Sequence, residues 1–99
     1  MLTHSLVVKI VAKENRAEDV AAFLAGALAL AEAEEFTPVW FALRENATTF
    51  YITDAFSSAE DRQKHVEGEI AKALFASADE LLAEPPSIAS VEVMAYKLP

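Results

Sequence analysis

The chain contains no cysteine, and this absence removes several classes of chemistry at once. Without thiols there is no disulfide framework, no thiolate nucleophile and no zinc site built on cysteine. Glycine is also scarce, and the two glycines, Gly26 and Gly68, stand far apart. A glycine-rich phosphate loop, a Walker motif and a nucleophile elbow are therefore excluded. The lack of cysteine fits a reducing compartment, and we expect a cytoplasmic protein.

The chain also lacks long apolar runs and has few positively charged residues. No apolar stretch reaches the roughly 18 residues that a membrane span needs, and residues 1–15 lack the pattern of a signal peptide. We therefore expect neither. With 8 Lys and Arg against 16 Asp and Glu, the formal net charge is -8. This field repels phosphate backbones, so nucleic acid is not an expected partner, and the simplest effect of the charge is solubility.

What the chain does have is enough apolar material for a core. Hydrophobic residues make up 54% of its 99 positions, while it holds only 2 Gly and 4 Pro. This composition argues against disorder, and the length predicts one domain that spans residues 1–99.

The spacing of apolar residues predicts the order of the elements. Apolar side chains alternate in the strand segments and recur every three or four residues in the helices. Asn15 and Ser57 are each followed three residues later by glutamate, which is typical of capping boxes. Gly68 separates the last two helices, and Pro85-Pro86 ends the second of them. The predicted strands cover residues 4–12, 39–44, 49–56 and 87–98, and the predicted helices cover residues 15–34, 57–67 and 69–84.

This β-α-β-β-α-α-β order suits an α+β, ferredoxin-like fold with a four-stranded antiparallel sheet. Helices then cover one face of the sheet only. The strands are apolar on both alternating faces, so the second face needs a cover of its own. Because a monomer rarely tolerates an exposed apolar face of several hundred Å², we predict a homodimer whose sheets pack face to face.

Residues 50–88 (FYITDAFSSAEDRQKHVEGEIAKALFASADELLAEPPSI) resemble the second half of the antibiotic biosynthesis monooxygenase (ABM) family, also grouped as quinol monooxygenases in the dimeric α/β-barrel superfamily. The matching pattern is a strand ending in acid-x-aromatic (Asp54-Ala55-Phe56), a helix with His65, and a glycine-broken helix before Leu-Leu-Ala-Glu-Pro-Pro. VVKIVAKENRAEDVAAFLAGALALAEAE and TPVWFALREN are similar to the first half of the family. The resemblance covers nearly the whole chain and implies a ferredoxin-like monomer in a barrel-like dimer.

The resemblance also implies an activity. Characterised oxygenases of this family act on a hydroxylated aromatic or quinol without flavin, haem or metal, because the deprotonated substrate itself supplies electrons to O₂. The protein then has to bind a flat ring, accept its proton and exclude water. Two positions depart from family patterns: Phe56 stands where many members have Trp, and Leu74 stands where the haem-degrading members have a histidine. Haem degradation is therefore disfavoured.

His65 and Asp54 are the candidate acid–base pair. An imidazole exchanges protons near neutral pH, and a neighbouring carboxylate orients the ring and raises its basicity, so we take His65 as the base and Asp54 as its support. The alternatives are a surface histidine and an aspartate that reaches solvent or caps the next helix. His4 is the other histidine, and no His-x-x-x-His spacing is present, so no metal is expected.

Aromatic side chains and one arginine complete the predicted site. The expected lining of a pocket between helices and sheet is Trp40, Phe41, Phe56 and Phe75. Trp40 and Phe41 are adjacent and point to opposite faces, and the sequence leaves open which of them shares a face with Asp54. Arg44 is a candidate for neutralising an anionic ligand oxygen, with a solvated salt bridge at the hairpin as its alternative. For the aromatic residues the alternative is packing in the core or at an interface.

Two other functions remain open on the same fold. The first is a dimer that binds a small molecule, or serves in stress or regulation, without catalysis. The second is an isomerase that uses the same acid–base pair without consuming O₂.

Overall fold

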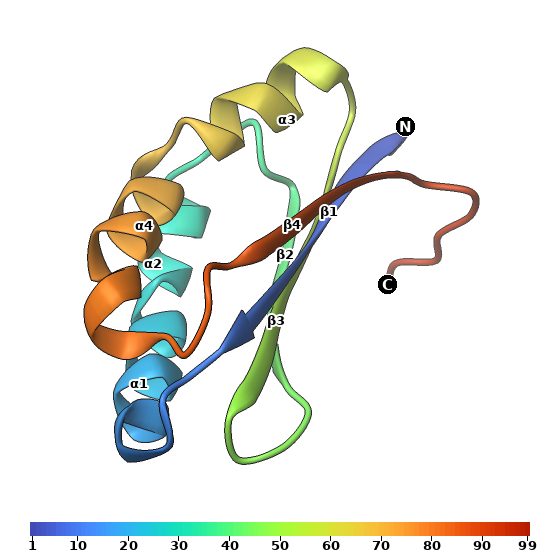
Figure 1. Ribbon diagram of the computed structural model, residues 1–99. Coiled ribbons are helices and arrows are strands. Elements are labelled where there is room, and N and C mark those ends of the chain that lie inside the picture. Colours follow the sequence, from blue (N-terminus) through green and yellow to red (C-terminus); the bar gives the residue numbers. More distant parts are fainter.

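The computed structural model describes residues 1–99 and forms one antiparallel sheet with helices packed on one of its faces (Figure 1). The strand order is β2-β3-β1-β4, so the first strand lies in the middle and pairs with both the third and the last. This is the predicted ferredoxin-like α+β fold. The strands are β1 (His4–Val11), β2 (Val39–Arg44), β3 (Thr49–Phe56) and β4 (Ser87–Glu92). The helices are the 3₁₀ turn η1 (Glu14–Arg16), α1 (Ala17–Gly26), α2 (Leu28–Glu32), α3 (Ala59–Val66) and α4 (Glu69–Leu81).

The starts of two helices differ from the predicted capping boxes. No side chain caps α1, because residues Glu14–Arg16 first form the 3₁₀ turn, so the box at Asn15 is wrong. The cap of α3 is Ser58 rather than Ser57, and its hydroxyl accepts a hydrogen bond of 3.1 Å from the Asp61 amide. Such a cap satisfies one of the free amides at a helix start and contributes about 1 kcal/mol.

The long first helix is divided in two. The Ala27 amide donates both to the Phe23 carbonyl, at 3.0 Å, and to the Leu24 carbonyl, at 3.2 Å. This shared bond mixes α-helical and 3₁₀ spacing, and α1 gives way to α2 at Ala27.

The last strand is shorter than predicted. β4 ends at Glu92, whose partner is His4, the first residue of β1. Beyond that pair only the Val93 amide still bonds, at 3.0 Å, to the carbonyl of Thr3, the residue before β1, because β1 begins at His4. Residues 93–99 therefore leave the sheet (Figure 1) and turn back until the Tyr96 hydroxyl accepts a hydrogen bond from the Leu2 amide.

The core lies between the sheet and the helices. Side chains of β1 and β3 that point to the helix side interleave with one face of α1 and of α4. Burying a large apolar side chain contributes about 1.5–3 kcal/mol, so this layer fixes how the helices sit on the sheet. Its main members are Leu6, Val8, Ile10, Val20, Leu24, Phe50, Ile52, Phe56, Ile70 and Leu74.

The opposite face of the sheet is uncovered. Phe41 is 53% exposed and Leu43 is exposed on the same strand, while Val91 is exposed on β4 at the other edge of this face. Strand register places Phe41 opposite Thr53, so this face also carries polar side chains and is less uniformly apolar than expected. None of the helices has the length and apolar character that crossing a bilayer requires.

Candidate functional site

The site begins with His65, which α3 directs into the protein. α3 starts at the Ser58 cap and returns over the end of β3, so residues of its inner side meet the sheet. The His65 side chain is 7% exposed, and its ring lies 5.3 Å from the ring of Phe56, centroid to centroid. The alternative of a surface histidine is therefore wrong.

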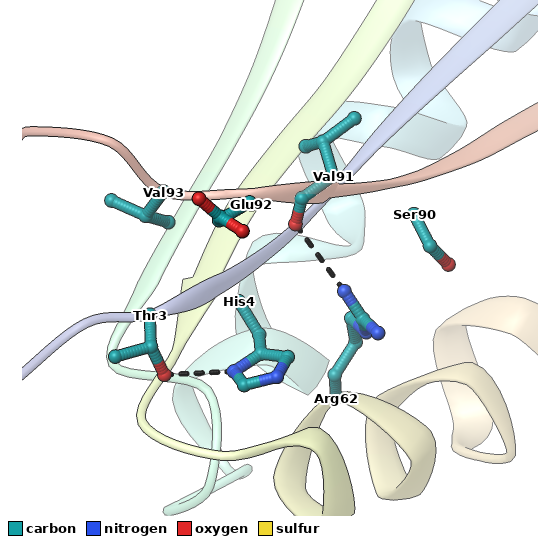
Figure 2. Close-up of a pocket in the computed structure, with 7 residues that line it drawn as sticks. All are labelled: Thr3, His4, Arg62, Ser90, Val91, Glu92 and Val93. Atoms are coloured by element: carbon teal, nitrogen blue, oxygen red, sulfur yellow. Dashed lines mark hydrogen bonds between the residues drawn. The ribbon is translucent and has the colours of Figure 1, made fainter.

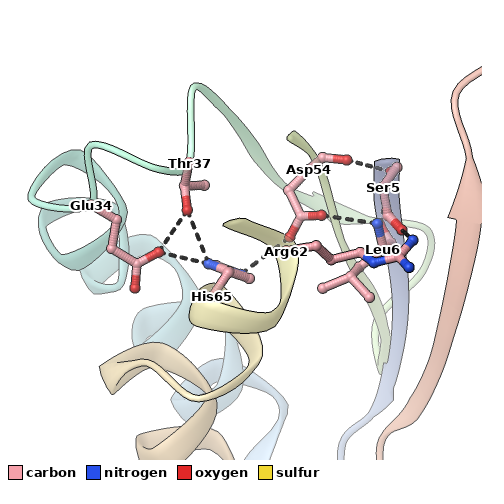
Figure 3. Close-up of polar contacts among 7 residues, drawn as sticks. All are labelled: Ser5, Leu6, Glu34, Thr37, Asp54, Arg62 and His65. Carbon is pink, nitrogen blue, oxygen red and sulfur yellow. Dashed lines mark hydrogen bonds and ion pairs between the residues drawn. The ribbon is translucent and has the colours of Figure 1, made fainter. Parts of the chain in front are cut away.

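Two carboxylates flank the ring, one at each nitrogen (Figure 3). His65 Nε2 lies 3.2 Å from Asp54 Oδ2, and His65 Nδ1 lies 2.6 Å from Glu34 Oε1. Thr37 completes a triangle, since its hydroxyl donates to Glu34 Oε1 at 2.8 Å and lies 3.3 Å from His65 Nδ1. We refer to Asp54, His65 and Glu34 together as the acid–imidazole–acid cluster.

Asp54 is buried because β3 alternates. It lies between Ile52 and Phe56 on the helix-facing side, and its carboxylate is fully inaccessible to solvent. Asp54 Oδ1 accepts a hydrogen bond of 3.0 Å from the Leu6 amide, and the Ser5 hydroxyl donates to the Asp54 carbonyl. A buried carboxylate needs such partners, since its desolvation costs several kcal/mol. It neither reaches solvent nor caps α3.

Gly68 leaves room for Glu34. The backbone of Gly68 is extended, with φ at -83°, so any residue could adopt it. A Cβ atom at this position, however, would lie 2.6 Å from Glu34 Oε2. Glycine between α3 and α4 therefore lets Glu34, which follows α2, approach the imidazole.

The two carboxylates set the charge of the ring. Burial alone lowers the pKa of His65, but the contacts with Asp54 and Glu34 outweigh it and raise the pKa above its ordinary value. The raised pKa favours the protonated ring, whose two N–H groups face one carboxylate each. Both ring nitrogens contact carboxylates, whereas the predicted pair of His65 and Asp54 accounts for only one of these contacts.

A small apolar cavity lies beside the ring. Its volume is about 30 Å³, and His65 is the one lining residue that is not hydrophobic. This is room for about one water molecule, whereas drug-sized ligands occupy cavities of roughly 300 Å³ or more. The predicted pocket for a flat ring is thus closed in this conformation. Phe75, half exposed on α4, forms part of its lining.

The structure brings some of the predicted aromatic residues to the cluster. Trp40 is the strand partner of Asp54 and shares its face, and its indole nitrogen is buried without a hydrogen-bond partner. Phe56 is fully buried against His65. Phe41 lies on the opposite face of the sheet, so its predicted place in the same pocket is wrong.

Arg44 does not reach the cluster. Its guanidinium pairs with Glu18 at 2.8 Å, donates to the Ala47 carbonyl and stacks 4.9 Å from the centre of the Phe50 ring. These contacts hold it at the hairpin end of the sheet, away from the cluster, and the pair with Glu18 is the salt bridge that the sequence offered as its alternative.

Sequence reasoning missed Glu34 and Thr37. The one available signal was an acidic residue just past the C-terminus of a helix, where the helix dipole disfavours negative charge. The cluster does not suit a metal ion, because its carboxylates stand at opposite nitrogens of one ring. No group of three or more His, Asp or Glu side chains is arranged to hold one.

Comparison with solved structures gives clear neighbours. NE2512 from Nitrosomonas europaea, a protein of unknown function, is 46% identical with a TM-score of 0.97, covering 100% of this chain and 96% of the other. PA3566 from Pseudomonas aeruginosa is 18% identical, with a TM-score of 0.82 and coverage of 96% and 97%. A protein from N. europaea that carries the provisional name antibiotic biosynthesis monooxygenase is 15% identical, with a TM-score of 0.81 and coverage of 93% and 90%. No protein-family model and no curated protein matches significantly.

Proposed function

Since the chain belongs to the family of the N. europaea protein NE2512 and has the fold of the ABM-like proteins, we propose that it is a cofactor-independent monooxygenase. Its substrate would be a small hydroxylated aromatic or quinol, handled in the cytoplasm. One observation carries the proposal: three ionisable side chains are buried together, and one of them, His65, lines a small apolar cavity. Buried, strongly coupled titratable groups next to a cavity are typical of acid–base sites.

The cluster takes the proton of the substrate. Because both nitrogens of His65 already contact carboxylates, the group that accepts this proton is a carboxylate, and Glu34 suits the role better than Asp54. Glu34 is 10% exposed and Asp54 is not exposed at all, and only one oxygen of Glu34 contacts the ring. His65, expected to be the base itself, then acts by holding both carboxylates and balancing their charge.

The rest of the reaction needs little from the protein. The deprotonated quinol supplies four electrons to O₂: one oxygen atom replaces a ring hydrogen as a hydroxyl group, the ring is oxidised to the quinone level, and the other oxygen atom leaves as water, so the product is a hydroxyquinone. The buried indole N–H of Trp40 is a free donor on the same face as Asp54, and a substrate oxygen would satisfy it. Binding a ring requires the cavity to widen, which the half-exposed Phe75 allows on α4.

Oxygen uptake by metal-free protein with a panel of hydroquinones and hydroxynaphthoquinols tests the proposal. We expect uptake above the autoxidation background that falls at least about tenfold in Glu34→Gln and in His65→Gln. Glu35→Gln, which removes the same charge from an exposed neighbour, is the matched control and keeps the wild-type rate. Equal rates in Glu34→Gln and Glu35→Gln would remove Glu34 from the chemistry.

Binding without catalysis is the second candidate, and specific observations favour it. Both nitrogens of His65 are engaged, and the cavity holds only about 30 Å³. In this case the cluster is structural, and no substrate in the panel raises oxygen uptake. A ligand that co-purifies with the protein would then identify the role. Conversion of a substrate without oxygen uptake would instead indicate an isomerase.

The uncovered sheet face fits a second copy of the chain. Phe41 and Leu43 are exposed apolar side chains at the β2 edge of this face and Val91 is one at the β4 edge, and Met94 and Tyr96 of the terminal segment are exposed as well. A face of this kind is stabilised when a partner covers it, and closed two-fold pairs are the commonest assemblies. Light scattering during size-exclusion chromatography should give twice the chain mass of 10.8 kDa. A mass equal to one chain would exclude the dimer.

A further inference from the structure

A cleft lies where β1 begins and β4 ends, and none of its lining residues belongs to the acid–imidazole–acid cluster. Its volume is about 560 Å³, and its lining is mostly polar (Figure 2). Arg62 reaches into it from α3, while Thr3, His4, Ser90 and Glu92 come from the two strands and the residue before β1. The small cavity beside His65 shares no lining residue with this cleft.

Backbone carbonyls hold the guanidinium of Arg62 in place. Arg62 Nη1 donates to the Ser5 carbonyl at 3.4 Å and to the Val91 carbonyl at 3.3 Å (Figures 2 and 3). Nε and Nη2 make no hydrogen bond within the protein. These two groups form the lateral fork of an arginine, whose parallel donors match the two oxygens of a carboxylate or phosphoryl group.

Arg62 is also the one arginine of the chain without an acidic partner. Arg16 pairs with Asp19 and Glu80, and Arg44 pairs with Glu18. The chain offers 16 Asp and Glu for 8 Lys and Arg, so carboxylates are plentiful. A half-buried guanidinium that is fixed by carbonyls yet left without an anion is therefore a receptive group rather than a paired one.

Neighbouring groups add hydrogen-bonding capacity to the cleft. The Thr3 hydroxyl lies 2.7 Å from His4 Nδ1, which leaves the other ring nitrogen of His4 free. Ser90 contributes a hydroxyl on the facing strand. Glu92, exposed at the edge, is the one lining group that repels an anion.

We propose that this cleft binds a small anion, a carboxylate or a phosphoryl group, on the free fork of Arg62. The site goes beyond the proposed oxygenase activity and does not depend on it, because neither Glu34 nor His65 lines the cleft.

Titration of ¹⁵N-labelled protein with benzoate and with inorganic phosphate, against sodium chloride at equal ionic strength, tests the site. We expect saturable NMR shifts of the Arg62 Nε–H and of the amides of residues 90–93 with at least one probe. Arg62→Gln should weaken this binding about tenfold or more, the usual size for a charge-assisted pair of bonds. Lys64→Gln removes the same charge two residues along α3, where Lys64 pairs with Asp61, and should leave the affinity unchanged.

Glu92→Gln should change the affinity for the anion in the direction opposite to Arg62→Gln. It leaves the contacts between Arg62 and the backbone carbonyls in place. Removing this repulsion should tighten binding roughly two- to fivefold. Shifts with benzoate alone assign the site to carboxylates, and shifts with phosphate alone assign it to phosphoryl groups. The proposal is overturned if neither probe binds beyond the chloride control. It is also overturned if Arg62→Gln binds as wild type, or if Glu92→Gln leaves the affinity unchanged.

Discussion

The two faces of the sheet invert the usual distribution of polar and apolar groups. On the helix-covered face, Asp54 and His65 are buried among core side chains. On the uncovered face, Phe41 and Leu43 are exposed to solvent. The buried charges are stabilised by groups of the same chain, whereas the exposed apolar groups lack a partner within it. Changes on the first face should therefore act on folding, and changes on the second should act on association.

The largest expected effect comes from removing the charge between the two carboxylates. His65→Ala leaves Asp54 and Glu34 buried without their shared partner and should lower the free energy of unfolding by about 3–5 kcal/mol. His4→Ala, which removes a less buried ring with no carboxylate contact, should cost under about 1 kcal/mol. Urea denaturation of both variants measures the difference. Equal costs would show that the carboxylates do not depend on the imidazolium.

The second largest expected loss of stability comes from filling the space that Gly68 leaves beside Glu34. Gly68→Ala places a methyl group against the carboxylate and should lower the free energy of unfolding by about 1–3 kcal/mol. Moving Glu34 away should also lower the pKa of His65, which NMR titration of the ring records. Gly26→Ala is the matched control, since a Cβ there meets nothing within 4 Å. It should stabilise the chain by about 0.4–1 kcal/mol, and a loss at Gly26 equal to that at Gly68 would contradict the steric explanation.

The cluster also predicts how stability changes with pH. Because the folded-state pKa of His65 is raised, its stabilising contribution is complete below the unfolded value of about 6.5 and is lost as the pH rises through the folded value. The free energy of unfolding should therefore fall from pH 6 toward alkaline pH. In His65→Gln this fall should be absent, and its persistence there would assign it to another group.

The smallest effect on folding is expected on the uncovered face. Phe41→Ser should change the free energy of unfolding of the single chain by less than about 1 kcal/mol, measured at low protein concentration, because the side chain is half exposed. The same variant should lose the dimer in light scattering. A stable dimer in Phe41→Ser would place the contact between copies elsewhere.

The fold was predictable because each element carries its own periodicity. Alternation in residues 49–56 and the apolar stripe through Ile70 and Leu74 need no knowledge of distant residues. The end of β4 did not follow from such a pattern. Residues 93–98 alternate like a strand, but apart from the bond between Val93 and Thr3 they have no neighbouring strand to pair with, because β1 begins at His4.

Two of the three residues of the cluster, Asp54 and His65, were predictable from the sequence, and Glu34 was not. The Asp54–His65 contact joins residues that are close in sequence, and the resemblance pointed to both. Glu34 lies 31 residues before His65, and nothing local connects them. Gly68 separates α3 from α4, as the sequence predicts, but the space it leaves for Glu34 has no signal in the sequence. Contacts of this kind depend on the packing of α2 against α4, which a single sequence does not display.

The central position of β1 has a consequence for the order of folding during synthesis. β1 can pair with β3 once residue 56 has been synthesised. Its other edge pairs with β4, which is complete only when Glu92 has been added, 88 residues after His4. At roughly 5–20 residues per second, this edge stays open for roughly 4–18 s. An unpaired edge is a template for other chains, and pairing over such a sequence separation is slow. The nascent chain is therefore most exposed to aggregation just before its last strand is made.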